Sequence, residues 1–122
     1  MTSLPTARPH RSGRYFCPER ATVRVLRGGG DEAHEVALGR TGIHRFEMVA
    51  SGLDLKAGER ITVELAFPAL RRRIVAEARV TDLIEGRDGS TRYRCRFVRI
   101  APWGVRALLS LASADAPTRR AC

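Results

Sequence analysis

Lysine is almost absent from this chain. Of the 22 basic residues only Lys56 is a lysine and the other 21 are arginines, and with 13 acidic residues the net charge is +9. The planar guanidinium of arginine forms paired hydrogen bonds with phosphates and guanine edges and stacks on rings. A GC-rich genome produces the same bias toward arginine, so composition alone predicts no more than an affinity for anions.

Long hydrophobic runs are also missing. The longest, residues 66–70 and 107–112, fall far short of the roughly 20 apolar residues that a membrane helix needs. The first residues carry Pro5, Pro9 and two early arginines in place of the apolar segment of a secretory signal. We therefore expect no membrane insertion and a location in the cytoplasm.

Cysteine and histidine are scarce as well. Cys17, Cys95 and Cys122 show no Cys-x-x-Cys spacing, and the three histidines stand at no ligand spacing to them. This predicts no metal and no cofactor, and an odd cysteine count without an export signal favours reduced thiols. We expect Cys95, which lies within an apolar alternation, to be buried. No nucleophile elbow or phosphate-binding loop is present, so we predict no catalytic residue and no enzyme.

Period-two alternation of apolar residues is abundant. It predicts strands at residues 21–27, 34–38, 43–49, 61–67, 74–80 and 93–97. Gly39 and Gly42 interrupt the pattern, which indicates a tight turn or a β-bulge. Six short strands in a small chain favour closure into a barrel, because closure removes exposed strand edges.

The last element has a different period. Trp103, Ala107, Leu108 and Leu111 share one helical face behind Pro102. The predicted fold is therefore all-β, a six-stranded antiparallel β-barrel with one C-terminal α-helix. We expect a flexible basic arm at residues 1–13, the barrel with its helix at 14–113, and a polar tail at 114–122.

One strand carries an arginine stripe. Arg92, Arg94 and Arg96 alternate with apolar residues, and a hairpin would place Arg79 opposite Arg96 on the outward face. The stripe is either a solvated face or a nucleic-acid-binding surface. The chain has only seven aromatic residues to offer as stacking platforms, and Tyr93 points to the opposite face, which weighs against nucleic acid.

The order of these elements resembles the PilZ domain family. The resemblance covers residues 10–113 and is carried by RYFCPERATVRVL at residues 14–26, AGERITVELAF at residues 57–67, and the strand pair with its following helix. PilZ domains are six-stranded antiparallel barrels that serve as bacterial receptors for cyclic di-GMP. The resemblance implies a receptor or adaptor in second-messenger signalling, with cyclic di-GMP as ligand, a protein as partner and no chemistry of its own.

The ligand motifs of the family are only partly matched. In the Arg-x-x-x-Arg arm, Arg14 takes the second position while the first falls on His10, beside Arg11. The motif Asp/Asn-x-Ser-x-x-Gly falls on residues 37–42, where Ala37 and Gly39 replace the two polar residues.

These departures predict that nucleotide binding is weak or lost, because buried polar contacts to guanine are missing. The predicted ligand-binding residues are Arg8, Arg11, Arg14, Arg40 and Gly42. Arg14 and Gly42 match the family motifs, Arg8 and Arg11 belong to the arginine-rich arm, and Arg40 would compensate as a phosphate contact. Ligand capture by the arm would order it against the barrel and change a partner-binding surface. The alternative from another class is a basic barrel that binds nucleic acid through residues 92–96.

Overall fold

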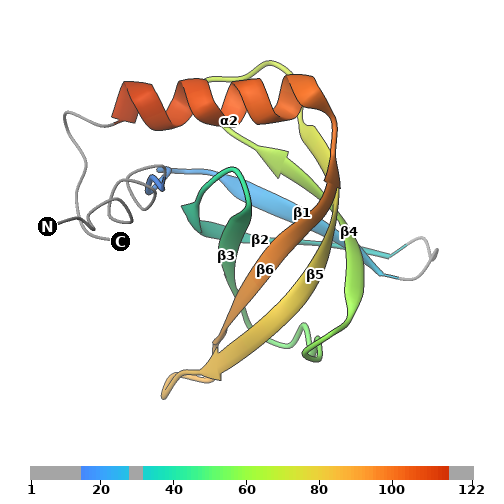
Figure 1. Ribbon diagram of the computed structural model, residues 1–122. Coiled ribbons are helices and arrows are strands. Elements are labelled where there is room, and N and C mark those ends of the chain that lie inside the picture. Colours follow the sequence, from blue (N-terminus) through green and yellow to red (C-terminus); the bar gives the residue numbers. More distant parts are fainter. Residues whose placement is uncertain (1–14, 28–31, 116–122) are drawn as a thin grey trace, which may run out of the picture.

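The computed structural model describes residues 15–27 and 32–115. Six strands precede one helix in the chain (Figure 1). Their bounds are β1 (Thr22–Arg27), β2 (Ala33–Thr41), β3 (Arg45–Ala50), β4 (Arg60–Ala66), β5 (Ile74–Glu85), β6 (Thr91–Ile100) and α2 (Pro102–Asp115). The arm predicted at residues 1–13 lies outside the described residues.

The strands form a closed barrel in the order β1-β2-β3-β6-β5-β4. All pairings are antiparallel. The predicted fold class is thus confirmed. Closure leaves no strand as a free edge, so each backbone ladder is satisfied within the described chain.

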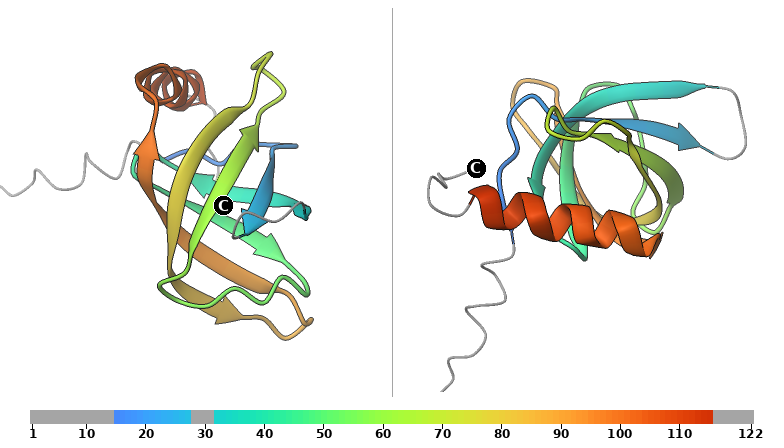
Figure 2. Two further views of the ribbon diagram at one scale, coloured as in Figure 1. Left: turned by 90° about the vertical axis from the view of Figure 1, so that its right-hand side faces the viewer. Right: turned by 90° about the horizontal axis from the view of Figure 1, so that it is seen from above.

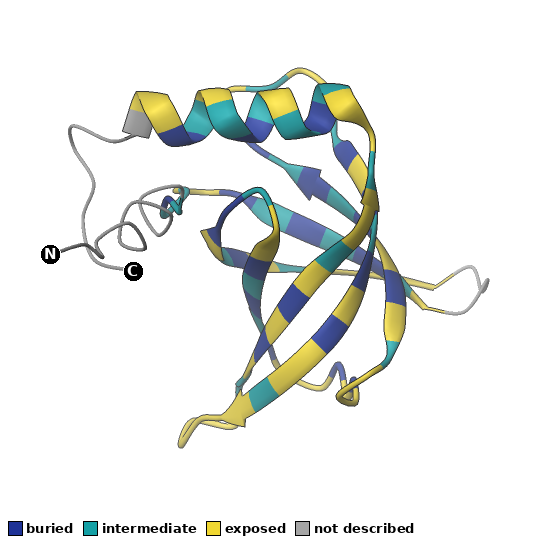
Figure 3. Cartoon of the chain, in the orientation of Figure 1, coloured by how far each residue is buried: buried dark blue, intermediate teal, exposed yellow. Residues whose placement is uncertain are grey.

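Apolar side chains at alternate positions of the strands fill the interior of the barrel. Side chains at every second position point inward, as the alternating bands on β5 and β6 show (Figure 3). Val23, Val25, Met48, Val63 and Leu65 are completely buried. Their outward neighbours are mostly polar, which is the period-two signature of a half-solvated strand.

Three strands are longer than their predicted apolar patterns: β2 continues to Thr41, and β5 and β6 continue toward the turn that joins them. Pairing of β5 with β6 continues to Glu85 and Thr91, next to the turn at residues 86–90. The segment beyond Val80 is largely exposed, so backbone hydrogen bonding extends it without an apolar alternation. Asp82 therefore lies within a strand.

Bulges interrupt the ladders at three places. The β2–β3 register shifts between Leu38 and Thr41, which confirms the bulge indicated by Gly39. The β5–β6 register shifts near Val98 and again at Thr81. A bulge turns the following residues to the other face of a strand. It therefore changes which charged side chains become neighbours on the outer surface.

The helix α2 lies across one end of the barrel (Figure 2). Leu108 on its inner face is completely buried, and Trp103 packs partly buried against the core. The guanidinium carbon of Arg72 lies 4.0 Å from the centroid of the Trp103 ring. At Gly104 a Cβ would come within 2.9 Å of the Ile74 side chain, so this glycine allows the close approach.

The buried thiol of Cys95 is confirmed. Its exposed fraction is 1%, and burial, with a contribution from the Asp82 charge, raises its pKa to about 12.

Truncating the buried contact of the helix tests this packing. We expect Leu108→Ala to lower the free energy of unfolding by about 2–5 kcal/mol, because it removes buried methyl groups and leaves a cavity. The exposed Arg106→Ala on the same helix should change it by less than about 0.5 kcal/mol. Thermal or urea unfolding followed by circular dichroism measures both, and equal effects would contradict the placement of α2.

The burial of Cys95 predicts how this residue reacts with a thiol reagent. Near pH 8, where an ordinary cysteine is partly ionised, a maleimide should not label Cys95 in the folded protein. In denaturing urea the same residue should label fully. Peptide mass spectrometry identifies the modified cysteine, and rapid labelling of Cys95 without denaturant would show that the barrel interior is accessible.

Candidate functional site

The segment before β1 is tied to the bulge in β2. The Phe16 N–H donates to the Thr41 carbonyl (2.8 Å), and the Thr41 N–H donates to the Phe16 carbonyl (2.9 Å). Thr41 is completely buried, and its hydroxyl donates to the Gly39 carbonyl at 2.8 Å. Tyr15 is thereby placed beside Arg40, whose guanidinium carbon lies 5.5 Å from the ring centroid. The residue that follows Arg14 thus lies at the motif predicted at residues 37–42.

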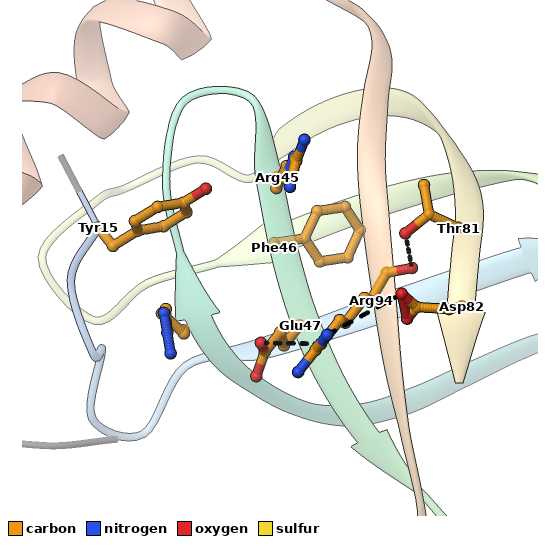
Figure 4. A pocket seen from close by; sticks show the side chains of 8 residues that line it. Tyr15, Arg45, Phe46, Glu47, Thr81, Asp82 and Arg94 are labelled. Carbon is orange, nitrogen blue, oxygen red and sulfur yellow. Dashed lines mark hydrogen bonds and ion pairs between the residues drawn. The ribbon is translucent and has the colours of Figure 1, made fainter. Parts of the chain in front are cut away.

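A cavity of about 270 Å³ opens on this side of the barrel (Figure 4). Strands β2, β3, β5 and β6 contribute its walls together with the segment before β1. Its lining residues are Tyr15, Arg40, Arg45, Phe46, Glu47, Thr81, Asp82 and Arg94. Its volume suits part of a small ligand, such as a base or a phosphate, more than a whole dinucleotide.

The cavity carboxylates are already engaged with arginines. Arg94 lies between Glu47 and Asp82, with its Nε 3.6 Å from Glu47 Oε2 and its Nη1 4.0 Å from Asp82 Oδ2 (Figure 4). Arg92 Nη1 lies 3.1 Å from Glu47 Oε1. Arg40 and Arg45 form no ion pair with any described residue, so they are the cations that an anion in the cavity would meet.

Of the motif residues 37–42 only Arg40 lines the cavity, and the other positions supply no polar side chain to it. Ala37 is exposed on β2, opposite Val49 of β3, and offers only a methyl group. A Cβ at Gly39 would lie 3.4 Å from the Glu47 carbonyl oxygen, so a side chain there would point toward the cavity wall. The Gly42 N–H donates to the Arg45 carbonyl at 2.8 Å and closes the turn between β2 and β3.

The sequence-predicted site residues divide into two groups. Arg40 and Gly42 lie together at the β2–β3 turn, whereas Arg8, Arg11 and Arg14 lie outside the described residues. Sequence reasoning missed Arg45 and Tyr15. The signal for Arg45 was its place just after Gly42, since a tight turn returns the chain beside the motif.

The arginine stripe of β6 is mostly neutralised. Arg92 and Arg94 pair with Glu47, and Arg94 also with Asp82. Only Arg96 of the three forms no ion pair with a described residue. The expected placement of Arg79 opposite Arg96 is confirmed.

Unpaired arginines instead form a row across the strands. Arg60 of β4 lies opposite Arg79 of β5, Arg79 opposite Arg96 of β6, and Arg96 opposite Arg45 of β3. All four are exposed, and none forms an ion pair with another part of the described chain. We call these four residues the arginine row. Like charges directly opposite each other destabilise a sheet, so the row places four mutually repelling charges side by side.

No helix among residues 15–27 and 32–115 is long and apolar enough to span a membrane. The same residues contain no group of three or more side chains arranged to hold a metal ion.

The sequence matches no family model and no curated protein. The structure resembles a Bacillus subtilis inhibitor of motility (MotI/DgrA), with a TM-score of 0.73, 18% identity, and coverage of 88% of this chain and 53% of that one. It also resembles YcgR in complex with c-di-GMP from Escherichia coli, with a TM-score of 0.69, 13% identity, and coverage of 85% of this chain and 45% of that one. The PilZ domain of YcgR with c-di-GMP gives a TM-score of 0.61 at 11% identity, with coverage of 82% of this chain and 86% of that domain. This chain thus spans about half of the first two proteins and most of the isolated domain, and its fold is that of a PilZ domain.

Repulsion within the arginine row predicts an effect on the stability of the barrel. At low salt we expect Arg79→Gln to raise the free energy of unfolding by about 0.2–1 kcal/mol, because it removes repulsion from two cross-strand neighbours. The gain should fade in about 1 M salt, where charges are screened within about 3 Å. Urea unfolding at both salt concentrations measures it, with Arg106→Gln as the control. A loss of stability at low salt would mean that Arg79 has a favourable partner.

Proposed function

We propose that this chain is a PilZ-like signalling module, a receptor or adaptor for cyclic di-GMP pathways that performs no catalysis. The fold supports the class of module, since similar structures include two that contain c-di-GMP. The module binds its nucleotide weakly or has lost it, and it works through a protein partner in the cytoplasm. The observation that carries the proposal is the cavity beside β2, at which the segment following Arg14 meets residues 37–42.

The cationic half of a nucleotide site is present at this cavity. Arg40 and Arg45 have no carboxylate partner in the described chain, and the Tyr15 ring beside Arg40 offers a stacking surface. Arg8, Arg11 and Arg14 would join them from the arm. Guanidinium groups recognise phosphates by charge-assisted paired hydrogen bonds, so this half favours anions of many kinds.

The base-reading half is deficient. Ala37 and Gly39 stand where the family has a carboxylate or amide and a hydroxyl, and neither can hydrogen-bond to guanine through a side chain. Each lost bond of this kind costs about 1–3 kcal/mol. Phosphate contacts without base contacts give weak binding with little choice between nucleotides.

Isothermal titration with cyclic di-GMP tests the proposal. The wild-type protein should bind more weakly than micromolar or not at all. The triple graft Ala37→Asp, Gly39→Ser and His10→Arg should strengthen binding at least about tenfold, which corresponds to about 1.4 kcal/mol and lies within the range expected for a single polar contact. Adding Arg45→Ala to the graft should remove most of that gain, because it deletes a cavity cation.

The control is Ala57→Asp, which adds the same charge in the exposed loop between β3 and β4. It should leave the titration unchanged. Sub-micromolar binding by the wild type would contradict the weak-binding proposal. An unchanged affinity of the graft would show that residues 37–42 are not the base-reading motif.

A further inference from the structure

We propose that the arginine row is a docking surface for an extended, acidic segment of a partner protein, one with carboxylates at alternate positions. The inference extends the adaptor half of the proposed function. It needs no nucleotide, because Arg60, Arg79 and Arg96 lie outside the cavity and only Arg45, at one end of the row, also lines it. Four exposed, mutually opposed cations without described partners are costly in a free protein, and a multivalent anion would remove that repulsion.

The width of the row limits what can bind. On one side Glu77 lies opposite Arg99, and on the other Asp82 lies opposite Arg94, which Glu47 also flanks. Residues two apart along a strand are separated by about 7 Å, so carboxylates border the row at that distance on both sides. Those carboxylates are paired with Arg92, Arg94 and Arg99, so a flat anionic membrane or a DNA duplex would cover neutral ion pairs on both sides without a matching gain. A single extended chain fits on the unpaired arginines between them.

The length of the row fits a short peptide. Neighbouring strands are about 4.8 Å apart, so four arginines span about 14 Å. An extended chain places alternate side chains about 6.6–7 Å apart. About five residues with carboxylates at the first, third and fifth positions therefore cover the row, each within reach of a flexible guanidinium.

The surface beside the row favours a peptide over single-stranded nucleic acid. The large apolar side chains exposed on the described surface are aliphatic, Val75, Ile84 and Val98, and the half-exposed Tyr15 ring lies in the cavity at the Arg45 end of the row only. Base stacking needs exposed rings. Val98 lies on β6 two residues beyond Arg96, where it can contact the aliphatic side chain of a docked segment.

Fluorescence anisotropy of the full chain tests this surface. The probe is a labelled peptide of about eight residues that alternates glutamate and valine, long enough to span the row. Its matched control replaces each glutamate with glutamine, and an oligothymidine of similar length represents nucleic acid. We expect the glutamate peptide to bind, the glutamine peptide not to bind, and binding to weaken as salt rises.

Two double variants locate the binding site. Arg79→Gln with Arg96→Gln, in the centre of the row, should weaken peptide binding at least tenfold. The control variant, Arg87→Gln with Arg106→Gln, removes the same charge from the turn after β5 and from α2. It should change the peptide affinity less than twofold. Since the row variant should be at least as stable as the wild type at low salt, loss of binding there cannot come from unfolding.

The opposite results overturn the inference. Equal losses in the two double variants would show attraction to net charge alone. Tighter binding of oligothymidine than of the glutamate peptide would make the face a nucleic-acid surface, and no peptide binding at low salt would remove the docking role. Cyclic di-GMP is titrated separately, and Arg60, Arg79 and Arg96 do not line its proposed cavity, so either proposal can fail without the other.

Discussion

Pairing of β1 with β4 is the interaction on which the rest of the structure depends, because it closes the sheet into a barrel. Once Val23 lies opposite Leu65 and Val25 opposite Val63, each strand has two neighbours and one interior face. Apolar side chains at alternate positions then fill that interior, and the other half of each strand must face solvent. The arginines occupy this outer half, so closure determines which charges become neighbours.

Bulges then adjust which side chains reach the outer surface. After Val80 points inward, strict alternation would turn Asp82 inward as well. The bulge at Thr81 places Asp82 opposite Arg94 on the outside, and the Thr81 hydroxyl donates to the Arg94 carbonyl at 3.0 Å. A similar shift near Val98 brings Arg99 beside Glu77, 3.9 Å apart. Two local irregularities thus supply partners for two arginines of β6.

The outer surface therefore separates arginines that have a carboxylate partner from arginines that have none. Carboxylates from β3 and β5 neutralise Arg92, Arg94 and Arg99, while the arginine row between these pairs has none in the described chain. Exposed ion pairs add little stability, and opposed arginines subtract some. The stability of the barrel must come from its interior, which leaves the outer charges available for binding.

The sequence by itself determined the strands, their inward faces and the helix, since period-two and helical patterns report local geometry and burial. It also placed Cys95 in the core and the bulge near Gly39. It did not determine the ends of β5 and β6, where the apolar pattern stops and only backbone pairing continues. The contact between Tyr15 and Arg40 could not be predicted from the sequence either. The same holds for the arginine row, whose members come from separate parts of the chain. Those contacts depend on strand order and register, which arise only when the barrel closes and every ladder finds its partner.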